Sequence, residues 1–431
     1  MKIAVIGTGY VGLTVVCLAD YGHEIFLLGR DKAKAEAIGR GFCPIYEPGL
    51  EAILERNVKK GLIHSGIDYS VIKECEIVLI CVGTPARDDG SIDLSQIQSA
   101  SEGIAKQLND NKYRVVCVKS TVVPKTTKDF VIPILEKFSG KKAGKDFGVC
   151  MNPEFLKEGY GVEDFVNPDK IVIGALDEKS YEIFSKIYAD FVGKTHFVKT
   201  DLNTAEMIKY AQNSALATRI SFINEIANIC EQVAVDVKDV AKAIGLDKRI
   251  GPKFLNAGIG FGGSCFPKDV KALVFIAKAH GIEPKILSSV LDVNKNQPSR
   301  VNNLLKESLK NLHGKNIGVL GLAFKDNTDD MRDSASIPII SSLVEEGANV
   351  IAYDPKAVEN AKQIFGNKIT YAKTIEEVLN GNDATLILTE WGEFKNIDYS
   401  NVKLIIDGRR ILDPATIPSN AVYKGIGWRN N

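Results

Sequence analysis

The sequence has no excess of charge of either sign, because 54 lysine and arginine residues are matched by 54 aspartate and glutamate residues. Such a balance provides no overall field that would attract the chain to nucleic acid or to an anionic membrane. No apolar run approaches the ~20 residues that a membrane helix needs, and Met1-Lys2 leads directly into an apolar strand rather than a signal-peptide core. We therefore expect a soluble cytoplasmic protein with small-molecule partners, no nucleic-acid partner and no membrane partner.

Paired cysteine spacings and repeats are also absent. The eight cysteines include no C-x-x-C pair, and seven of them are interpreted as small, reduced core residues, several within apolar runs such as IVLICVG and RVVCVKS. The sequence contains neither a low-complexity segment nor a short-period repeat, which argues against repeat architectures. Cys265 is the exception among the cysteines, because it lies among glycines and polar residues. No metal site is expected.

The chain does contain an alternation of short apolar runs with helical patterns. In the first two hundred residues the expected strands are KIAVIG, EIFLLG, EIVLICVG, RVVCVKS, FGVCMNPE and IVIGA. This rhythm predicts a parallel, doubly wound sheet. Apolar and small residues at helical spacing from Leu202 to about Val233 predict one long helix, and Pro298 should divide a second helical stretch from Ile286 to Leu312.

The alternation restarts after His313. KNIGVLGLAFK, a helix around Ile337 to Glu346, and the runs NVIAYDP, ATLILTEW and KLIIDGR predict a second, smaller α/β domain. The predicted fold class is α/β, with two Rossmann-like doubly wound domains joined by a central helical region. We expect an N-terminal dinucleotide-binding domain over residues 1–200, the helical domain over 201–312 and the C-terminal domain over 313–431.

A glycine fingerprint lies between the first two expected strands. Gly7, Gly9 and Gly12 form G-x-G-x-x-G after a strand and before a helix, and a second strand follows within about 30 residues. Gly7 permits the tight turn, Gly9 lets the backbone approach a pyrophosphate, and Gly12 lets the helix pack closely on the strand. A purely structural turn is the alternative, but all three surrounding elements are present. The motif predicts a nicotinamide dinucleotide site.

The end of the second expected strand bears on the choice of dinucleotide. It reads Leu28-Gly29-Arg30-Asp31, where an NAD-specific site normally has a carboxylate that binds the ribose 2′-hydroxyl. Gly29 removes the charge that would repel a 2′-phosphate, and Arg30 adds a cation. These residues favour NADP over NAD. The alternative is that Asp31 performs the NAD-binding task from two positions further along.

The segment from Ala257 to Asp269 is the most informative in the chain. Four glycines precede Cys265, and Pro267 suits the first turn of a helix. Cys265 would then lie just before the helix N-terminus, where the dipole and the free N–H groups stabilise a thiolate. Asp269 would lie in the first helical turn near the thiol, and the glycines would let a substrate approach closely. The alternative is a glycine-rich loop with an incidental buried cysteine.

Two further groups of polar residues accompany this segment. Lys209 and Asn213 are one turn apart on the predicted long helix, with Glu206 on a neighbouring face. A lysine and an amide on one stripe can stabilise a developing oxyanion, although such a pair is otherwise a solvated helix face. Glu154 and Glu158 follow an apolar strand and offer two carboxylates, whereas exposed loop glutamates are usually inert.

Seven motifs occur in the order seen in UDP-glucose 6-dehydrogenases and span nearly the whole chain. They are GTGYVGL from Gly7, CVGTP from Cys81, KSTV from Lys119, NPEFLKEG from Asn152, GGSCFPKD from Gly262, FKDNTDDMR from Phe324 and DGRR from Asp407. The chain resembles the UDP-glucose/GDP-mannose dehydrogenase family, and GGSCFPKD with RIGPKFLNAG ahead of it is most similar to the UDP-glucose branch.

The resemblance implies a two-step, four-electron oxidation of the sugar C6 alcohol to a carboxylate, with two oxidised NAD(P) cofactors and one water. The catalytic roles that it implies are Cys265 as the nucleophile that forms a thiohemiacetal and then a thioester, Lys209 and Asn213 as oxyanion stabilisers, Asp269 in water-assisted proton transfer, and Thr121 and Glu154 at the hydrolytic water. Lysine and the carboxylates both remain candidates for the base of the first step.

Binding residues follow from the same resemblance. Those expected at the dinucleotide are Gly7, Gly9, Tyr10, Val11, Gly12, Gly29, Arg30, Val82, Gly83, Thr84, Ser120, Thr121, Glu158, Lys268 and Arg332. Those expected at the UDP-sugar, which the C-terminal domain would bind, are Glu154, Phe155, Leu156, Glu158, Lys209, Asn213, Arg249, Phe254, Gly262, Cys265, Phe324, Lys325 and Arg409. Lys325 and Arg409 would supply cations for the diphosphate. An isolated exposed lysine or arginine would normally have no such role, but these lie inside matching motifs.

Subunit assembly is also implied. Arg249 resembles an arginine that reaches the site of the neighbouring subunit, so we expect a homodimer or a higher homo-oligomer whose contacts lie in the central helical domain.

Some positions depart from the family pattern. Gly29 replaces the second-strand aspartate, Lys125 replaces a common glycine, and Asn256 stands where some relatives carry lysine. Because Asn256 bears on pyrophosphate contacts, another UDP-hexose, such as UDP-galactose or a UDP-N-acetylhexosamine, is the alternative substrate. A non-catalytic nucleotide-sugar binding protein and a two-electron alcohol dehydrogenase are alternatives of other classes, and the nucleophilic cysteine argues against both.

Overall fold

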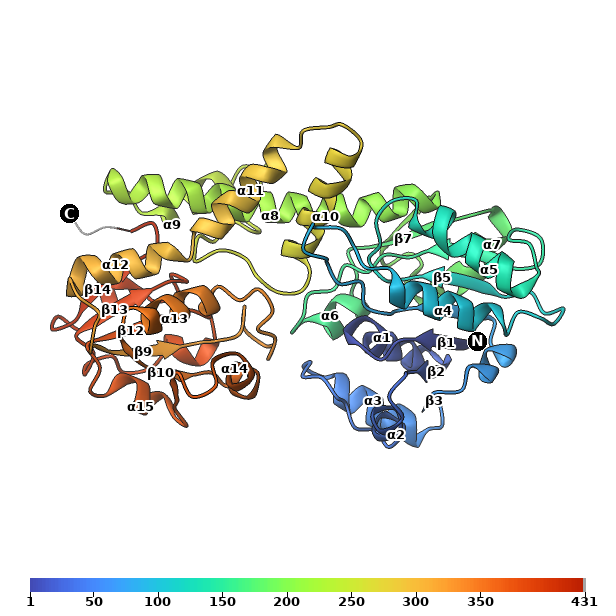
Figure 1. Ribbon diagram of the computed structural model, residues 1–431, viewed down its shortest axis with the longest axis horizontal. Helices are drawn as coiled ribbons and strands as arrows, with labels where there is room; N and C mark the ends of the chain where they lie inside the picture. Colours follow the sequence, from blue (N-terminus) through green and yellow to red (C-terminus); the bar gives the residue numbers. More distant parts are fainter. Residues whose placement is uncertain (429–431) are drawn as a thin grey trace. The chain divides into compact units, whose positions relative to one another are not determined.

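The structure is a computed structural model that describes residues 1–428. The chain forms two compact units, Met1–Gln212 and a second unit that begins at Asn213. Each unit contains one sheet, and the long helix α8 (Leu202–Gln232) crosses the border between them (Figure 1). This helix confirms the long helix predicted from Leu202 onward. No helix within residues 1–428 is long and apolar enough to cross a membrane.

The sheet of the first unit has eight strands in the order β3-β2-β1-β4-β5-β6-β7-β8. The strands are β1 (Lys2–Ile6), β2 (Glu24–Leu28), β3 (Ile63–Gly66), β4 (Ile77–Ile80), β5 (Val115–Val118), β6 (Gly148–Met151), β7 (Lys170–Ala175) and β8 (His196–Thr200). All six expected strands are present. The sequence did not indicate β3 and β8, because IHSG and HFVKT carry few apolar residues. The strand order reverses between β1 and β4, where doubly wound sheets bind ligands.

The prediction of a wholly parallel sheet is wrong at one pair of strands. β6 and β7 pair antiparallel, with Cys150 opposite Ala175, while β7 and β8 are parallel to each other. The chain between β6 and β7 stays at the carboxyl edge of β6 and re-enters the sheet from that same edge. A parallel pair would need a crossover past the sheet face, and the one helix in this connection, α6 (Gly161–Val166), has only 6 residues.

Helices cover both faces of this sheet. Successive side chains of each strand point to opposite faces, and apolar residues on both faces need to be buried. The further helices of the unit are α1 (Tyr10–Thr14), η1 (Val15–Tyr21), α2 (Lys32–Gly39), α3 (Leu50–Lys59), η2 (Tyr69–Glu74), α4 (Ser95–Ala105), η3 (Thr126–Val131), α5 (Ile132–Ser139), α7 (Glu178–Ser185) and η4 (Lys186–Phe191). On β1, Ile3 and Val5 join the buried cluster of η1, α3 and α7, whereas Ala4 and Ile6 join that of α4 and α5. This period of two fixes the register of each strand.

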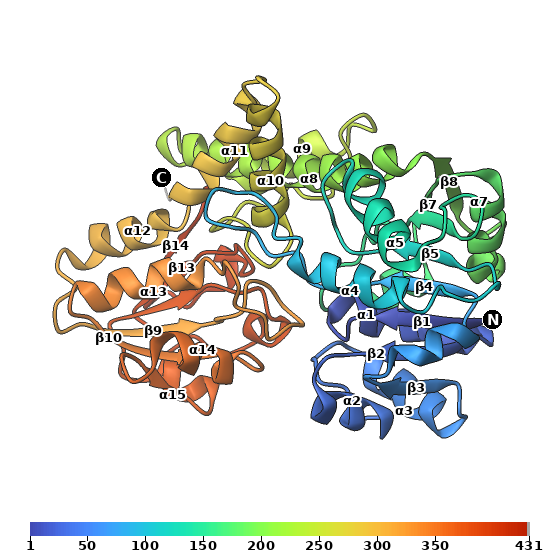
Figure 2. The same cartoon turned by 45° about the vertical axis from the view of Figure 1, so that its right-hand side comes forward.

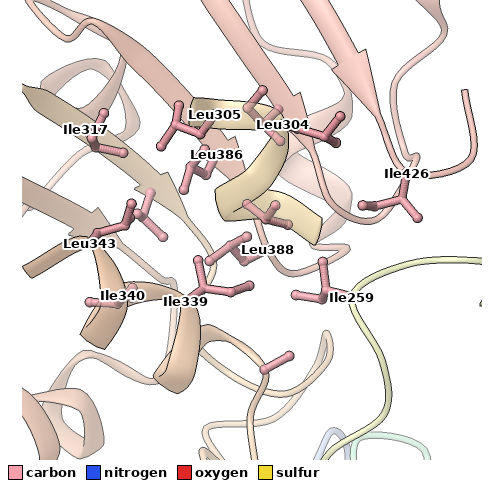
Figure 3. Close-up of a cluster of buried hydrophobic side chains, with 14 of the residues drawn as sticks. Ile259, Leu304, Leu305, Ile317, Ile339, Ile340, Leu343, Leu386, Leu388 and Ile426 are labelled. Carbon is pink, nitrogen blue, oxygen red and sulfur yellow. The ribbon is translucent and has the colours of Figure 1, made fainter. Parts of the chain in front are cut away.

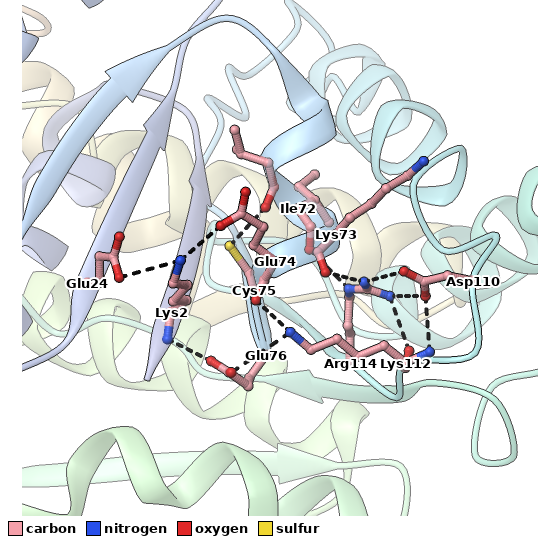
Figure 4. Close-up of polar contacts among 11 residues, drawn as sticks. Lys2, Glu24, Ile72, Lys73, Glu74, Cys75, Glu76, Asp110, Lys112 and Arg114 are labelled. Atoms are coloured by element: carbon pink, nitrogen blue, oxygen red, sulfur yellow. Dashed lines mark hydrogen bonds and ion pairs between the residues drawn. The ribbon is translucent and has the colours of Figure 1, made fainter.

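The fully buried Arg114, immediately before β5, links the start of this strand to η2 and to Asp110 (Figure 4). The guanidinium of Arg114 donates to both carboxylate oxygens of Asp110, at 2.5 and 2.6 Å, and to the carbonyls of Ile72 and Lys73 at 3.0 and 2.5 Å. Arg114 is 0% exposed, so these acceptors replace its hydration. The contact ties η2 and the loop before β5 to the sheet.

The sheet of the second unit has six strands, all parallel, in the order β11-β10-β9-β12-β13-β14. They are β9 (Asn316–Leu320), β10 (Asn349–Tyr353), β11 (Thr370–Tyr371), β12 (Ala384–Ile387), β13 (Leu404–Asp407) and β14 (Val422–Gly425). The order repeats the Rossmann pattern, and the reversal lies between β9 and β12. This confirms the second doubly wound domain.

The further helices of the second unit are α9 (Val237–Gly245), α10 (Phe266–Ala279), α11 (Lys285–Asn296), α12 (Ser299–Leu309), α13 (Ser336–Glu345), α14 (Val358–Phe365) and α15 (Ile375–Leu379), with the short turns η5 (Gly392–Lys395) and η6 (Pro414–Thr416). Some of these helices cover the sheet of this unit, whereas α10 and α11 pack with α8 in a separate cluster. Pro298 separates α11 from α12 as predicted. The two views show α12 and α13 on one side of the sheet and α15 on the other (Figures 1 and 2).

The buried core of this unit reaches beyond the sheet and its helices. Leu304 of α12, Leu343 of α13 and Leu386 of β12 pack in one cluster (Figure 3). Ile259, which is 0% exposed, joins the same cluster from the glycine-rich loop. The loop ahead of Cys265 is therefore anchored in the core.

Candidate active site

The glycine fingerprint forms the turn between β1 and α1. Gly7 has a φ of +114°, and a Cβ added there would lie 2.5 Å from the carbonyl oxygen of Cys81. A Cβ on Gly12 would lie 1.9 Å from the carbonyl oxygen of Gly7. A Cβ on Gly9 would meet nothing within 4 Å. The backbone thus leaves open space at Gly9, where a pyrophosphate would approach, and a dinucleotide fits this turn.

The loops that follow β4 and β5 are joined beside this turn. The hydroxyl of Ser120 donates to the carbonyl of Val82 at 2.7 Å, and the hydroxyl of Thr84 donates to the carbonyl of Thr121 at 2.8 Å. The structure therefore brings these four predicted site residues together at the carboxyl edge of the sheet. Thr121 is held through its main chain.

The end of β2 has no acidic side chain at Gly29. A Cβ there would lie 3.3 Å from the hydroxyl oxygen of Thr8. Arg30 is exposed and donates to the side-chain oxygen of Gln96 at 3.3 Å. Asp31 caps α2, with its Oδ1 accepting from the backbone N–H of Lys34 at 3.0 Å. One carboxylate oxygen of Asp31 is therefore already engaged in the helix cap.

Glu154 and Lys209 form a buried ion pair in the first unit. Lys209 Nζ lies 3.0 Å from Glu154 Oε1, and the side chains are 3% and 6% exposed. The other oxygen, Oε2, accepts from the backbone N–H of Leu156 at 2.7 Å. Burial alone would raise the pKa of Glu154, but the Lys209 charge and this backbone bond lower it overall. Glu154 is therefore an ionised acceptor at neutral pH.

Glu206, on the same helix as Lys209, has a different partner. It is 0% exposed, and its Oε1 accepts from the backbone N–H of Thr127 at 2.7 Å, at the start of η3. Burial raises the pKa of Glu206 to about 7. Glu206 lies three residues before Lys209, but it binds the start of η3 and takes no part in the Glu154–Lys209 ion pair.

Glu47 is a buried carboxylate that accepts several hydrogen bonds, and it was not predicted from the sequence. It accepts from the hydroxyl of Tyr10 at 2.6 Å and from the backbone N–H groups of Gly159 and Gly161, each at 2.7 Å. One carboxylate thus ties the fingerprint helix to the loop that contains Glu158. The Y-E-P-G turn that carries Glu47 offers no spacing signal, so only the folded chain shows the connection.

Cys265 is the N-cap residue of α10, as predicted. It is partly exposed, whereas the other seven cysteines are buried, which also confirms that interpretation. One turn later Asp269, 1% exposed, accepts from Asn213 Nδ2 at 2.6 Å and from Lys268 Nζ at 2.6 Å. The backbone N–H of Asp269 donates to the carbonyl of Cys265 at 2.9 Å. Four residues with expected roles thus form one connected group.

The glycines ahead of Cys265 differ from expectation. A Cβ on Gly262 would lie 2.2 Å from the carbonyl oxygen of Asp333, and one on Gly263, at φ +81°, would lie 2.7 Å from the ring of Phe324. Protein atoms already fill the space that we expected a substrate to use. These glycines instead let the loop pack against the segment that carries Phe324.

Side-chain amides fix the same loop. Asn224 Oδ1 accepts from the backbone N–H of Gly258 at 2.8 Å, Asn294 Oδ1 accepts from that of Phe261 at 2.7 Å, and Gln297 Nε2 donates to the carbonyl of Gly258 at 2.9 Å. These residues were missed, although polar amides within the apolar stripes of helices would have been a usable signal.

Arg409 connects the loops at the carboxyl edge of the second sheet. Its guanidinium donates to the carbonyls of Leu388, Gly260 and Phe324, at 2.9, 3.2 and 3.0 Å, and its Nε lies 3.2 Å from Glu390 Oε2. It therefore organises the loops beside the β9/β12 reversal. Lys325 Nζ lies 5.9 Å from the centroid of the Phe324 ring.

The buried carboxylate of Asp354 stabilises the loops at the same carboxyl edge of the second sheet. Asp354 accepts from the backbone N–H groups of Leu322 and Ala323, at 2.8 and 3.0 Å, and from Trp391 Nε1 at 3.1 Å. It fixes the segment immediately before Phe324. The sequence analysis did not single out Asp354.

Two other predicted residues pair with a neighbouring carboxylate, and a third has an unusual backbone angle. Arg249, with a side chain 88% exposed, pairs with Asp247 at 2.6 Å, and Arg332 pairs with Asp330 at 2.7 Å. Phe254 adopts a φ of +62°, which is unusual for a bulky residue and typical of functional loops.

Family models match three successive stretches of the chain. They are described as the NAD binding domain, the central domain and the UDP binding domain of the UDP-glucose/GDP-mannose dehydrogenase family, and they match residues 1–192, 203–296 and 318–414.

Similar proteins agree with these matches along the whole chain. A UDP-glucose 6-dehydrogenase of Haloferax volcanii is 44% identical over 422 residues, which cover 96% of this chain and 97% of the relative. A solved UDP-glucose dehydrogenase of Pyrobaculum islandicum is 36% identical with a TM-score of 0.93, covering 99% and 98% of the two chains. A solved UDP-D-ManNAc dehydrogenase of Pyrococcus horikoshii is 28% identical with a TM-score of 0.88, covering 99% of each.

Proposed function

Because the chain belongs to the UDP-glucose/GDP-mannose dehydrogenase family, we propose that it oxidises the C6 alcohol of UDP-glucose to the carboxylate of UDP-glucuronate. The observation that carries the proposal is the group formed by Cys265 at the N-terminus of α10 and Asp269 beside it. A two-electron alcohol dehydrogenase would have no use for a nucleophile in this position. The dinucleotide, when bound at the fingerprint, accepts one hydride in each of two oxidation steps.

The first step removes a hydride and a proton from the C6 alcohol and leaves an aldehyde. The Cys265 thiolate then adds to C6, and its sulfur–carbon bond makes a thiohemiacetal. Loss of a second hydride and of the hydroxyl proton gives a thioester, and water cleaves it to the carboxylate and the regenerated thiol. We assign oxyanion stabilisation to Lys209 and Asn213 and assistance to proton transfer to Asp269.

The hydrolytic water needs an acceptor for its proton. Glu154 is ionised in its ion pair with Lys209, which suits that task, and Thr121 would help to position the water. In this ion pair the Glu154 carboxylate can accept a proton in the first step, whereas Lys209 would first have to lose its own proton to act as the base.

The proposal is tested by counting reduced cofactors per sugar with purified protein. Two reduced cofactors per UDP-glucose are expected, and one would reject the thioester route. Cys265→Ser should lower kcat by at least about a hundredfold, because the serine hydroxyl lacks a readily formed anion. Near-normal carboxylate production by this variant would contradict the assignment.

A second substrate is favoured by one observation. The family resemblance implies that Asn256 stands where some relatives carry lysine, and the solved UDP-D-ManNAc dehydrogenase of Pyrococcus horikoshii shares the fold along the whole chain. The alternative is therefore a dehydrogenase of another UDP-hexose, such as UDP-galactose or a UDP-N-acetylhexosamine. A panel of nucleotide sugars, assayed at equal concentration, separates these substrates by kcat/KM.

For the cofactor we propose NADP+ over NAD+. Gly29 brings no negative charge to the end of β2, exposed Arg30 offers a cation, and Asp31 already caps α2. Arg30→Gln should lower kcat/KM for NADP+ about tenfold, since a charge-assisted phosphate bond is lost, and should leave NAD+ almost unaffected. The matched control is Arg40→Gln, an exposed arginine at the end of α2. A large preference of the wild type for NAD+ would overturn the proposal and favour Asp31 as the ribose ligand.

We propose a homodimer as the smallest working assembly. Phe222, Ile229 and Val233 lie along the second half of α8 and its end, and they are 51%, 53% and 60% exposed. An apolar stripe of this kind is typical of a subunit contact, and Arg249 would extend toward the partner's site. Light scattering should show a dimer or larger assembly, and Phe222→Glu should dissociate it.

A further inference from the structure

Two lysine ammonium groups lie over one aromatic ring beside Glu154. Lys170 Nζ is 4.2 Å from the centroid of the Phe155 ring, and Lys209 Nζ is 5.6 Å from the same centroid. Lys170 is the first residue of β7 and is partly buried, and its Nζ donates to Gln212 Oε1 at 2.5 Å. The aromatic ring and the amide thus hold the Lys170 ammonium in a defined position.

The charges around this position do not balance. Lys209 pairs with Glu154, the buried Lys119 also acts on the Glu154 carboxylate, and Lys170 lies close enough to Lys209 for their charges to interact. Asp169 beside Lys170 favours the ammonium form of Lys170, and it is exposed, so water weakens the effect of its charge. Glu206 on the same helix as Lys209 has a pKa raised to about 7 by burial, so a large part of it is neutral near pH 7.

Burial lowers the pKa of Lys170, the Asp169 charge opposes this shift, and the Lys209 charge adds to it, so that the pKa is lowered overall. The interaction between two like charges is mutual, so Lys170 acts against the ammonium form of Lys209 to the same extent. It also favours the ionised form of Glu154.

We propose that Lys170 is a positioning residue that acts through the Glu154–Lys209 pair and keeps that pair ready to accept a proton. It contributes a fixed positive charge that neither forms a bond with the pair nor touches the reacting atoms. The sequence analysis did not identify Lys170, and its role depends on Phe155 lying between β7 and α8. This inference rests on the proposed function.

The size of the effect follows from the distances. Lys170 Nζ and Lys209 Nζ lie 4.2 and 5.6 Å from one ring centroid, so they are at most about 10 Å apart. At an effective dielectric constant of about 20 this separation gives a shift in the pKa of Lys209 of at least about one pH unit. Removal of the Lys170 charge raises the pKa of whichever member of the pair is the base. The acidic limb of the pH–rate profile should therefore move upward.

The experiment measures kcat/KM for UDP-glucose against pH at saturating cofactor. Lys170→Gln should move the acidic limb upward by about one pH unit, whereas Lys170→Arg should restore the wild-type limb because it retains the charge. The matched control is Lys179→Gln, which removes a lysine over the Tyr113 ring, 3.4 Å from its centroid, elsewhere in the same unit. This control should leave the limb in place.

Three results would overturn the inference: an unmoved limb in Lys170→Gln, an equal movement in Lys170→Arg, or an equal movement in the control. If Lys170→Gln fails to fold, Lys170→Met keeps an alkyl chain over the Phe155 ring without the charge and should move the limb in the same direction. A wild-type protein without NAD(P)-linked oxidation of UDP-glucose would refute the proposed function instead. An active wild type with an unmoved limb refutes only the role of Lys170.

Discussion

Glu206 provides a quantitative test of the electrostatics in the first unit. Its carboxyl is completely buried, with a pKa raised to about 7 from an ordinary value of 4.5. The folded state therefore binds a proton that the unfolded state releases between these two values. Stability from this group is fully present below pH 4.5 and is lost as the pH rises through about 7.

The magnitude follows from the pKa difference. Linkage gives a loss of about 2.5 kcal/mol in the free energy of unfolding between about pH 5 and about pH 8. Glu206→Gln cannot ionise, and its amide oxygen can still accept the N–H of Thr127. Its NH₂ group needs a new acceptor, but that cost is independent of pH. The variant should therefore gain about 2.5 kcal/mol relative to wild type on passing from the lower to the higher pH.

Urea unfolding at the two pH values measures this difference. Far-UV circular dichroism is the suitable probe, because Trp391 and Trp428 both lie in the second unit and report there by fluorescence. The matched control is Glu225→Gln, an exposed glutamate on the same helix. A variant whose stability difference from wild type is equal at both pH values would refute the reasoning.

The remaining predictions concern packing and the catalytic group. Arg114→Met should destabilise the first unit by about 2–4 kcal/mol, because it leaves the main-chain carbonyls of Ile72 and Lys73 without their buried donor, and thermal melts would detect the loss. Gly263→Ala should raise the KM for the UDP-sugar, because the new methyl displaces the Phe324 ring at a strained φ, while an unchanged KM would contradict this packing. Asn213→Ala should lower kcat by about 10²-fold with little change in cofactor KM, because it loses an oxyanion donor and frees Asp269, and steady-state kinetics measures both.

Local patterns in the sequence were sufficient for much of the fold. The six strands expected in the first unit and the division of a helix at Pro298 are confirmed, because each depends on residues close together in the chain. The exception is the antiparallel pairing of β6 and β7. Its direction depends on which edge of the sheet the chain re-enters, and no periodicity records that choice.

Some features of the candidate site were also predictable from local sequence, whereas others depend on segments that are distant in the chain. The N-cap position of Cys265 was predictable, since glycines, a proline and an acidic residue surround it within a few positions. The hydrogen-bonding roles of Glu47 and Asp354 were not predictable, because each carboxylate binds main-chain N–H groups from segments distant in the chain. A carboxylate of this kind carries no signature apart from the fold that buries it.

The sequence by itself determined a dinucleotide turn built from Gly7, Gly9 and Gly12, a cysteine at a helix N-terminus, and two doubly wound sheets. These are properties of chain stereochemistry and short-range spacing. Only the tertiary structure decided that Glu154 meets Lys209, that Glu206 does not, and that Lys170 shares the Phe155 ring with Lys209. Charge interactions depend on distance and burial, and both arise when the sheet and α8 pack together.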